Sequence, residues 1–214
     1  ACTLWVLPNP ADVPDTAGVI LQQAPRLLSA VYGGTAASEN KWAIQLMAMA
    51  GMPSSPQSAQ PWRAQPQAGT SGVRYDLQNY VGVMPTAASA RLASVYEPPA
   101  AAGGYLALAL RASNPEPPGP WMAAAFSDPA DASDAKTSGR VWDVLVASDM
   151  AGPVTIAWDN VSNLPSGYEA YLLGAQAGPV NLRTSSSLVM GQPAGLTLAV
   201  GLPEFVAPFL APPP

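Results

Sequence analysis

The sequence contains no histidine and only one cysteine, and these two scarcities exclude much of enzyme chemistry. Histidine is the commonest general base near neutral pH and a frequent metal ligand. Its absence removes Ser–His–Asp and Cys–His catalysis, together with histidine-ligated zinc and iron sites. Cys2 alone supports neither an intramolecular disulfide nor a thiolate metal cluster. We therefore expect a protein that is not an enzyme and that carries no cofactor.

Charge is also scarce. Charged residues make up 11% of the 214 residues, against about 25% in an average soluble domain, and the net charge is −5. The nine basic residues are scattered, whereas binding to nucleic acid needs a concentrated cationic face. No stretch approaches the roughly 20 apolar residues that span a bilayer. We expect neither a nucleic-acid partner nor a membrane span.

Proline and glycine are abundant, at 25 and 18 residues, and this composition argues against long helices. From Lys41 onward apolar residues alternate with others, as in Trp42, Ile44 and Leu46, which is typical of half-buried strands. Short strands with turn residues between them predict an antiparallel sandwich. The expected strands are 41–48, 75–83, 91–96, 105–111, 121–126, 140–147, 154–159, 168–173, 179–183, 187–190 and 196–200.

The composition changes along the chain and predicts three parts. Residues 1–40 form an N-terminal arm with a short strand at 3–7 and a possible short helix near 24–32. Residues 41–201 form an all-β, immunoglobulin-like antiparallel β-sandwich that carries a long low-complexity loop at 51–72. Residues 202–214 form an extended, Pro-rich C-terminal tail of the polyproline type.

A series of short motifs resembles a known family. The series includes Trp42-Ala-Ile-Gln-Leu-Met-Ala, Asp76-Leu-Gln-Asn79-Tyr-Val-Gly82, Tyr96-Glu-Pro-Pro99 and Pro153-Val-Thr-Ile-Ala-Trp158-Asp. Over residues 41–201 the chain resembles β-sandwich modules of large secreted or cell-surface bacterial proteins, which often precede a C-terminal secretion-sorting domain. The resemblance implies no enzymatic chemistry and an extracytoplasmic location. Where the family has a Gly-rich acidic stretch, residues 86–95 contain no Asp, which puts any binding role of that stretch in doubt.

Three patterns raise chemical alternatives. Ser38-x-x-Lys41 and Ser133-x-x-Lys136 match a serine-activation motif, but that motif needs a helix start and both matches lie in loop or strand-edge sequence. A glycosidase needs paired carboxylates in a cleft, and the acidic residues here are dispersed. The triplet Asp128, Asp131 and Asp134 is a weak candidate for structural calcium, and a solvated, turn-favouring loop is the better explanation.

The aromatic residues divide into core and surface candidates. Trp42, Trp142 and Trp158 fall on alternating apolar faces, which predicts core positions. The expected interaction residues lie instead in the arm, the loop and the tail. They are Trp5, Trp62, Phe205, Phe209 and Leu210.

These observations predict a non-catalytic extracytoplasmic structural or assembly subunit, secreted, on the cell surface or periplasmic. Its partners would be other protein subunits, in a surface filament or layer or docked on a membrane complex, and an extended arm or tail can add to a neighbour's sheet edge. The alternative is a module that binds carbohydrate or another surface polymer through Trp62 and the 51–72 loop. Whether Cys2 carries a lipid stays open, as do the partner and the stoichiometry.

Overall fold

The computed structural model describes residues 41–51, 73–97, 105–113, 119–127, 139–174 and 178–211. The chain divides into two units, Ala1–Ala36 and Ala37–Pro214, and every described residue belongs to the second. Several expectations therefore lie outside the described residues. They concern Cys2, Trp5, the 24–32 helix, Trp62 with most of its loop, and the acidic triplet Asp128, Asp131 and Asp134.

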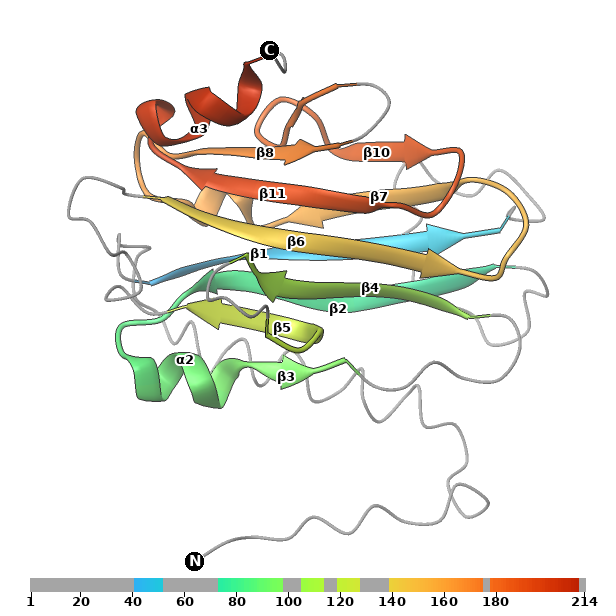
Figure 1. Ribbon diagram of the computed structural model, residues 1–214, viewed down its shortest axis with the longest axis horizontal. Coiled ribbons are helices and arrows are strands. Elements are labelled where there is room, and N and C mark those ends of the chain that lie inside the picture. The colour runs from blue at the N-terminus through green and yellow to red at the C-terminus, as the bar shows by residue number, and fades with distance from the viewer. Residues whose placement is uncertain are drawn as a thin grey trace, which may run out of the picture. The chain divides into compact units, whose positions relative to one another are not determined.

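Eleven strands form one mixed β-sheet (Figure 1). Ten of them follow the order β10-β7-β1-β2-β5-β4-β6-β11-β8-β9, and β3 pairs with β5 off this path. All neighbours are antiparallel except β2 and β5, which run parallel. The strands are β1 (Trp42–Ala50), β2 (Arg74–Val83), β3 (Val95–Tyr96), β4 (Leu106–Ala112), β5 (Met122–Ser127), β6 (Gly139–Ser148), β7 (Val154–Asp159), β8 (Glu169–Leu173), β9 (Val180–Asn181), β10 (Ser187–Met190) and β11 (Gly195–Gly201).

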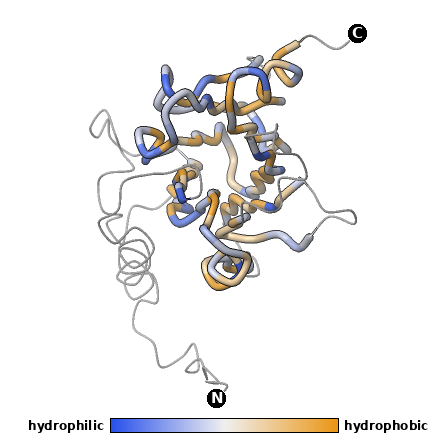
Figure 2. The backbone as a smooth tube through the Cα atoms, turned by 90° about the vertical axis from the view of Figure 1, so that its left-hand side faces the viewer, coloured by the Kyte–Doolittle hydropathy of each residue, from blue (hydrophilic) through white to orange (hydrophobic). Residues whose placement is uncertain are grey.

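The predicted two-sheet sandwich is wrong. The ten-stranded sheet turns through 331° and nearly closes into a barrel. The reason lies in the pairing: β1 pairs on its two edges with β2 and β7, and β6 pairs with β4 and β11, so hydrogen bonding continues around the structure instead of stopping at the edge of a layer. Figure 2, turned by 90°, shows the described chain running round a ring.

The interior of the barrel is a single apolar cluster in which Trp42, Trp142 and Trp158 are buried, which confirms their predicted core positions. Trp42 packs edge-on against two aromatic rings, with centroid distances of 5.8 Å to Trp142 and 6.4 Å to Tyr168. Edge-to-face contacts of this kind add to the free energy gained by burial. The alternation in the sequence therefore identified the inward face correctly even though the sheet is rolled.

Side chains tie together the two ends of the sheet, β9 and β10. The chain between them turns at residues 182–186, and the indole N–H of Trp158 on β7 donates to the carbonyl oxygens of Leu182 and Ser185, both at 2.9 Å. The Nε of Arg183 in the same turn donates to the Tyr168 carbonyl oxygen at 2.8 Å. These bonds fix the turn that connects β9 and β10, the two end strands of the nearly closed sheet.

Among the described residues, three helical segments connect or flank the strands: α2 (Ala87–Ala93), the 3-10 helix η4 (Val161–Asn163) and α3 (Pro203–Leu210). The strand expected at 91–96 is wrong, because α2 occupies its first half and only β3 is extended. A capping box starts α2: the Thr86 hydroxyl accepts from the Ser89 N–H at 3.1 Å, and the Ser89 hydroxyl accepts from the Thr86 N–H at 3.1 Å.

The extended tail expected from residue 202 is also wrong for residues 203–210, which form α3 against β8 and β11. Proline fits the first turn of a helix because the N–H that it lacks has no partner there, and Pro203 occupies that place. Val206 is buried, and Phe205 and Leu210 are partly buried. Apolar residues at this spacing form one helix face, so the tail covers its own barrel.

Candidate functional site

An exposed apolar surface lies over α2 and β3, and we call its residues Leu92, Val95 and Tyr96 the α2–β3 surface. Their side chains are 86%, 49% and 69% exposed. In the described chain only two other large hydrophobic residues, Val189 and Phe209, are classed as exposed. Exposed apolar residues that gather in one place are typical of an interaction site, whereas single ones are ordinary.

Local structure explains why these side chains remain uncovered. Helix α2 fully buries only Ala90, and most of its other residues, including Leu92, are exposed. Strand β3 pairs on one edge with β5, and no other strand in the described ranges pairs with it. The surface carries little charge, since α2 has no acidic residue in its first turn and only Arg91 in its last.

A second feature is a group of polar side chains in the wall of the barrel, the Asp76 cluster, which comprises Asp76, Asn79 and Glu97. A β-bulge in β2 places its first two members together. Leu46 pairs with Asn79 and Ala48 with Asp76, so two steps along β1 match three along β2. Because paired residues on adjacent strands share a face, Asp76 and Asn79 lie on the same face as the core residues Leu46 and Ala48.

Asp76 also joins β2 to β4 where ordinary strand pairing is missing. β5 pairs with the second half of β2, from Tyr80 onward, but meets β4 at a single pair, Leu110 with Met122. Beyond that point the Oδ2 of Asp76 accepts a hydrogen bond from the Leu108 N–H at 2.7 Å. The carboxylate thus replaces a backbone acceptor of the missing ladder.

Burial dominates the electrostatics of the cluster. It raises the pKa of Asp76, although hydrogen bonds from Leu108, Asn79 and Gln78 act in the opposite direction. Burial, and secondly the charge of Asp76, raises the pKa of Glu97 to about 7. Burial alone raises the pKa of the adjacent Tyr80 to about 12. Neither carboxyl pKa is lowered by a lysine or arginine of the described chain.

Hydrogen-bond acceptors outnumber donors in the cluster. The Nδ2 of Asn79 donates to the Oδ1 of Asp76 at 2.8 Å, which fixes the orientation of the amide. The Asn79 Oδ1 and the Glu97 Oε2 are both buried and accept no hydrogen bond. In the described residues no group of three or more His, Cys, Asp or Glu side chains is placed to hold a metal. The Asp76 cluster itself has only two carboxylates, those of Asp76 and Glu97.

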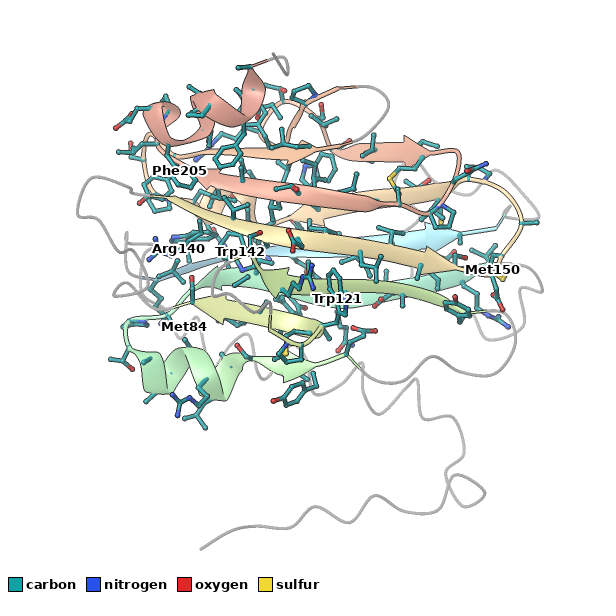
Figure 3. All side chains as sticks on the ribbon, viewed as in Figure 1. Met84, Trp121, Arg140, Trp142, Met150 and Phe205 are labelled. Atoms are coloured by element: carbon teal, nitrogen blue, oxygen red, sulfur yellow. The ribbon has the colours of Figure 1, made fainter. Side chains whose placement is uncertain are left out.

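Next to the cluster, at the junction of β4 and β5, Trp121 packs against a cation (Figure 3). The Arg111 guanidinium lies 4.4 Å from the centre of the Trp121 ring, and its Nε is bound to Asp143 at 2.8 Å. Ser113 donates to the same carboxylate at 3.0 Å. Because Arg111 covers one face of Trp121, this indole is a poor stacking platform for a sugar on that side.

The structure assigns different positions to the residues expected to interact. Phe205, Phe209 and Leu210 come together on α3, where Phe209 is 40% exposed and the rings of Phe205 and Phe209 lie 5.7 Å apart. The α2–β3 surface was missed because a strand was expected at 91–96. The sequence gives one sign of the Asp76 cluster, an aspartate inside an otherwise apolar and amide-rich strand. No sequence pattern indicates the bulge that places Asp76 and Asn79 on the same face.

None of the three helical segments in the described part of the chain is long and apolar enough to cross a membrane. The resemblance to secreted bacterial modules stays a prediction. Comparison with protein-family models, with curated proteins and with solved structures finds no match to this chain.

Proposed function

We propose that the protein is a non-catalytic assembly subunit whose copies associate through the α2–β3 surface. One observation carries this proposal, namely that Leu92 and Tyr96 are large apolar side chains only four positions apart and mostly exposed. A subunit that worked alone would gain nothing from presenting them to water, since burying such a side chain is worth about 1.5–3 kcal/mol.

The chemistry of the surface supports contact between copies. Tyrosine is enriched among the residues that dominate binding energy at interfaces, because its ring is apolar and its hydroxyl stays hydrogen-bonded. The surface is bordered by one charge of each sign, Arg91 in the last turn of α2 and Glu97 directly after Tyr96. Three apolar side chains per copy make a small interface, so we expect association at micromolar or higher concentrations.

Two further surfaces belong to the same proposal. Phe209 on α3 offers a partly exposed ring for a second contact, which replaces the extended tail as the contact surface at this end of the barrel. Trp5 in the arm stays a predicted contact outside the described residues. The low charge of the chain and its resemblance to secreted bacterial modules support an extracytoplasmic place for this assembly, on a surface layer or a membrane complex.

The proposal is tested by size-exclusion chromatography with light scattering on the full chain over a hundredfold range of concentration. We expect the average mass to rise with concentration, and we expect the double variant Leu92→Ser/Tyr96→Ser to stay close to the monomer mass. Val189→Ser is the matched control, because Val189 is 64% exposed on β10, away from the α2–β3 surface.

Two outcomes would count against self-assembly. A wild-type mass that stays monomeric across the whole range would contradict it directly. Equal effects of the double variant and of Val189→Ser would show that general surface hydrophobicity, not this surface, drives association. Circular dichroism of each variant checks that the barrel remains folded.

A further inference from the structure

Asn160 occupies a sharp corner of the backbone directly after β7. Among the described residues it is the one non-glycine residue with a positive φ, at φ 65° and ψ 14°. Asparagine adopts this left-handed conformation more readily than most residues. The Asn160 N–H donates to the Oδ1 of Asp159 at 2.8 Å, and its carbonyl oxygen accepts from the Asn163 N–H at 2.9 Å. These bonds hold the backbone of the corner in place.

The side chain of Asn160, by contrast, is not bound to the barrel. Asn160 is the N-cap residue of η4, where an asparagine side chain commonly accepts from the helix, but it makes no capping hydrogen bond. It makes no other side-chain hydrogen bond in the described chain, and its amide is not one of the buried polar groups that lack a partner. The Asn160 amide is therefore in contact with water.

The other described asparagines differ in how far their amides are occupied. Asn79 is 1% exposed, and its Nδ2 donates to Asp76. The Oδ1 of Asn181 accepts from the Arg183 N–H at 2.8 Å. Asn163 is half-buried like Asn160, and its side chain makes no hydrogen bond in the described chain. Asn160 and Asn163 are thus the two described asparagines whose side-chain amides are unoccupied.

The residues that follow distinguish these two asparagines. Asn160-Val161-Ser162 has the pattern Asn-x-Ser with x other than proline, which is the acceptor pattern for N-linked glycosylation. One of the seven asparagines of the chain has it, and Asn163, followed by Leu164-Pro165, does not. Because the pattern also arises by chance, its position has to support it. Ser162 is exposed and η4 buries no residue, so the amide and the hydroxyl of the pattern lie on one accessible turn.

We propose that the Nδ2 of Asn160 is the acceptor of an N-linked glycan. The co-substrate is an oligosaccharide joined through its anomeric carbon to a polyprenyl phosphate carrier, and a transferase of the host catalyses the step. A bond forms between Nδ2 and the anomeric carbon, and the bond from that carbon to the phosphate oxygen breaks. Nδ2 loses one proton, and the carrier leaves with the electron pair as a phosphate anion. The step requires neither an oxidant nor a reductant.

This inference rests on the extracytoplasmic location in the proposed function but not on self-association. In the sheet, β1 and β2 separate β7 from β5, and β3 pairs with β5. Figure 1 accordingly shows β7 in the upper half of the barrel and α2 with β3 along its lower margin. A glycan that starts at the end of β7 therefore leaves the α2–β3 surface open. One molecule can carry the glycan and still associate with a second copy.

Mass spectrometry of the full chain recovered from its native host tests the inference. We expect a glycopeptide whose added sugar mass is attached to Asn160. Asn160→Gln and Ser162→Ala should abolish this glycopeptide, whereas Ser162→Thr keeps the hydroxyl and should retain it. Asn163→Gln is the matched control, since it changes a second unoccupied amide of the same turn, and it should leave the glycopeptide unchanged. Circular dichroism checks that each variant is folded.

Fractionation of the same cells separates this inference from the proposed function. If the chain is recovered outside the cytoplasm and Asn160 carries no sugar, the inference is wrong, and self-association is unaffected. If the chain stays in the cytoplasm without a glycan, the inference and the extracytoplasmic location are both wrong. A glycan that persists in Ser162→Ala, or that is attached to another residue instead, would also contradict Asn160 as the acceptor.

Discussion

The ring of Phe205 in α3 lies so close to Gly139, the first residue of β6, that a Cβ on Gly139 would overlap it (Figure 3). Phe205 of helix α3 thus packs directly against the backbone of Gly139, where there is no side chain. We expect Gly139→Ala to destabilise the protein by about 1–3 kcal/mol, the usual cost of overpacking, measured by chemical denaturation.

A double-mutant cycle identifies the cause of that loss. Phe205→Ala removes the overlap, so the two changes together should cost less than the sum of their separate effects. Gly191→Ala is the control, because no atom lies within 4 Å of a Cβ placed there. Additive effects of Gly139→Ala and Phe205→Ala would show that α3 does not press on β6.

Removing the Asp76 carboxylate should loosen the junction between β2 and β4. Asp76→Ala leaves the Leu108 N–H and the Asn79 Nδ2 without their acceptor, so we expect a loss of about 2–4 kcal/mol of unfolding free energy. Native-state hydrogen exchange should show the Leu108 amide among those most accelerated. Asp159→Ala, an exposed change at the end of β7, is the control and should leave that amide protected.

The same substitution, Trp to Phe, can be compared at two buried positions, Trp158 and Trp142, of which only Trp158 makes an indole hydrogen bond. Trp158→Phe removes the indole N–H that holds the turn between β9 and β10, with an expected cost of about 1–2 kcal/mol beyond the lost packing. The Trp142 indole N–H is buried without an acceptor, so Trp142→Phe loses packing but no hydrogen bond. Only Trp158→Phe should accelerate amide exchange over residues 182–190. Equal acceleration in both variants would refute a specific role for the Trp158 bonds.

Stability in EDTA should depend on pH through Glu97. Its pKa of about 7 in the folded chain lies above its ordinary value of 4.5, so the folded chain holds a proton that the unfolded chain has already released. The stability from this group is complete below about pH 4.5 and is lost as the pH rises through about 7.

Glu97→Gln stays neutral and lacks this loss. In EDTA its melting temperature should exceed that of the wild type more at pH 8 than at pH 5. Glu204→Gln serves as the control, and a constant difference between wild type and Glu97→Gln at both pH values would contradict the raised pKa.

The strands were predictable from the sequence, and their arrangement was not. Alternation located β1, β2, β4, β5 and β6–β8 within a residue or two, because each strand has one face in the core. A sandwich and a barrel impose the same alternation, so the periodicity could not distinguish them. The decisive pairing of β1 with β7 joins residues more than a hundred positions apart, such as Met49 and Thr155.

Helix α2 and the position of Asp76 could not be predicted from the sequence for a different reason. Thr86 and Ser89 form a capping box, yet Val95 and Tyr96 directly after it favour a strand, so the local signals in 86–96 conflict. Asp76 looked like one of many dispersed acids. Only the bulge opposite Met47 turns it toward Asn79, and that bulge depends on how β1 and β2 pair.

The near-closure of the sheet has a consequence for biosynthesis. β1 cannot satisfy its second edge until β7 has been made, and the closing turn depends on residues 182–185 reaching Trp158. During translation, the edge of β1 that pairs with β7 therefore has no hydrogen-bonding partner until β7 has been made. Long-range pairing of this kind folds slowly and exposes unpaired edges to neighbouring chains. Closure of the barrel should therefore wait until β7 and residues 182–185 have both been made.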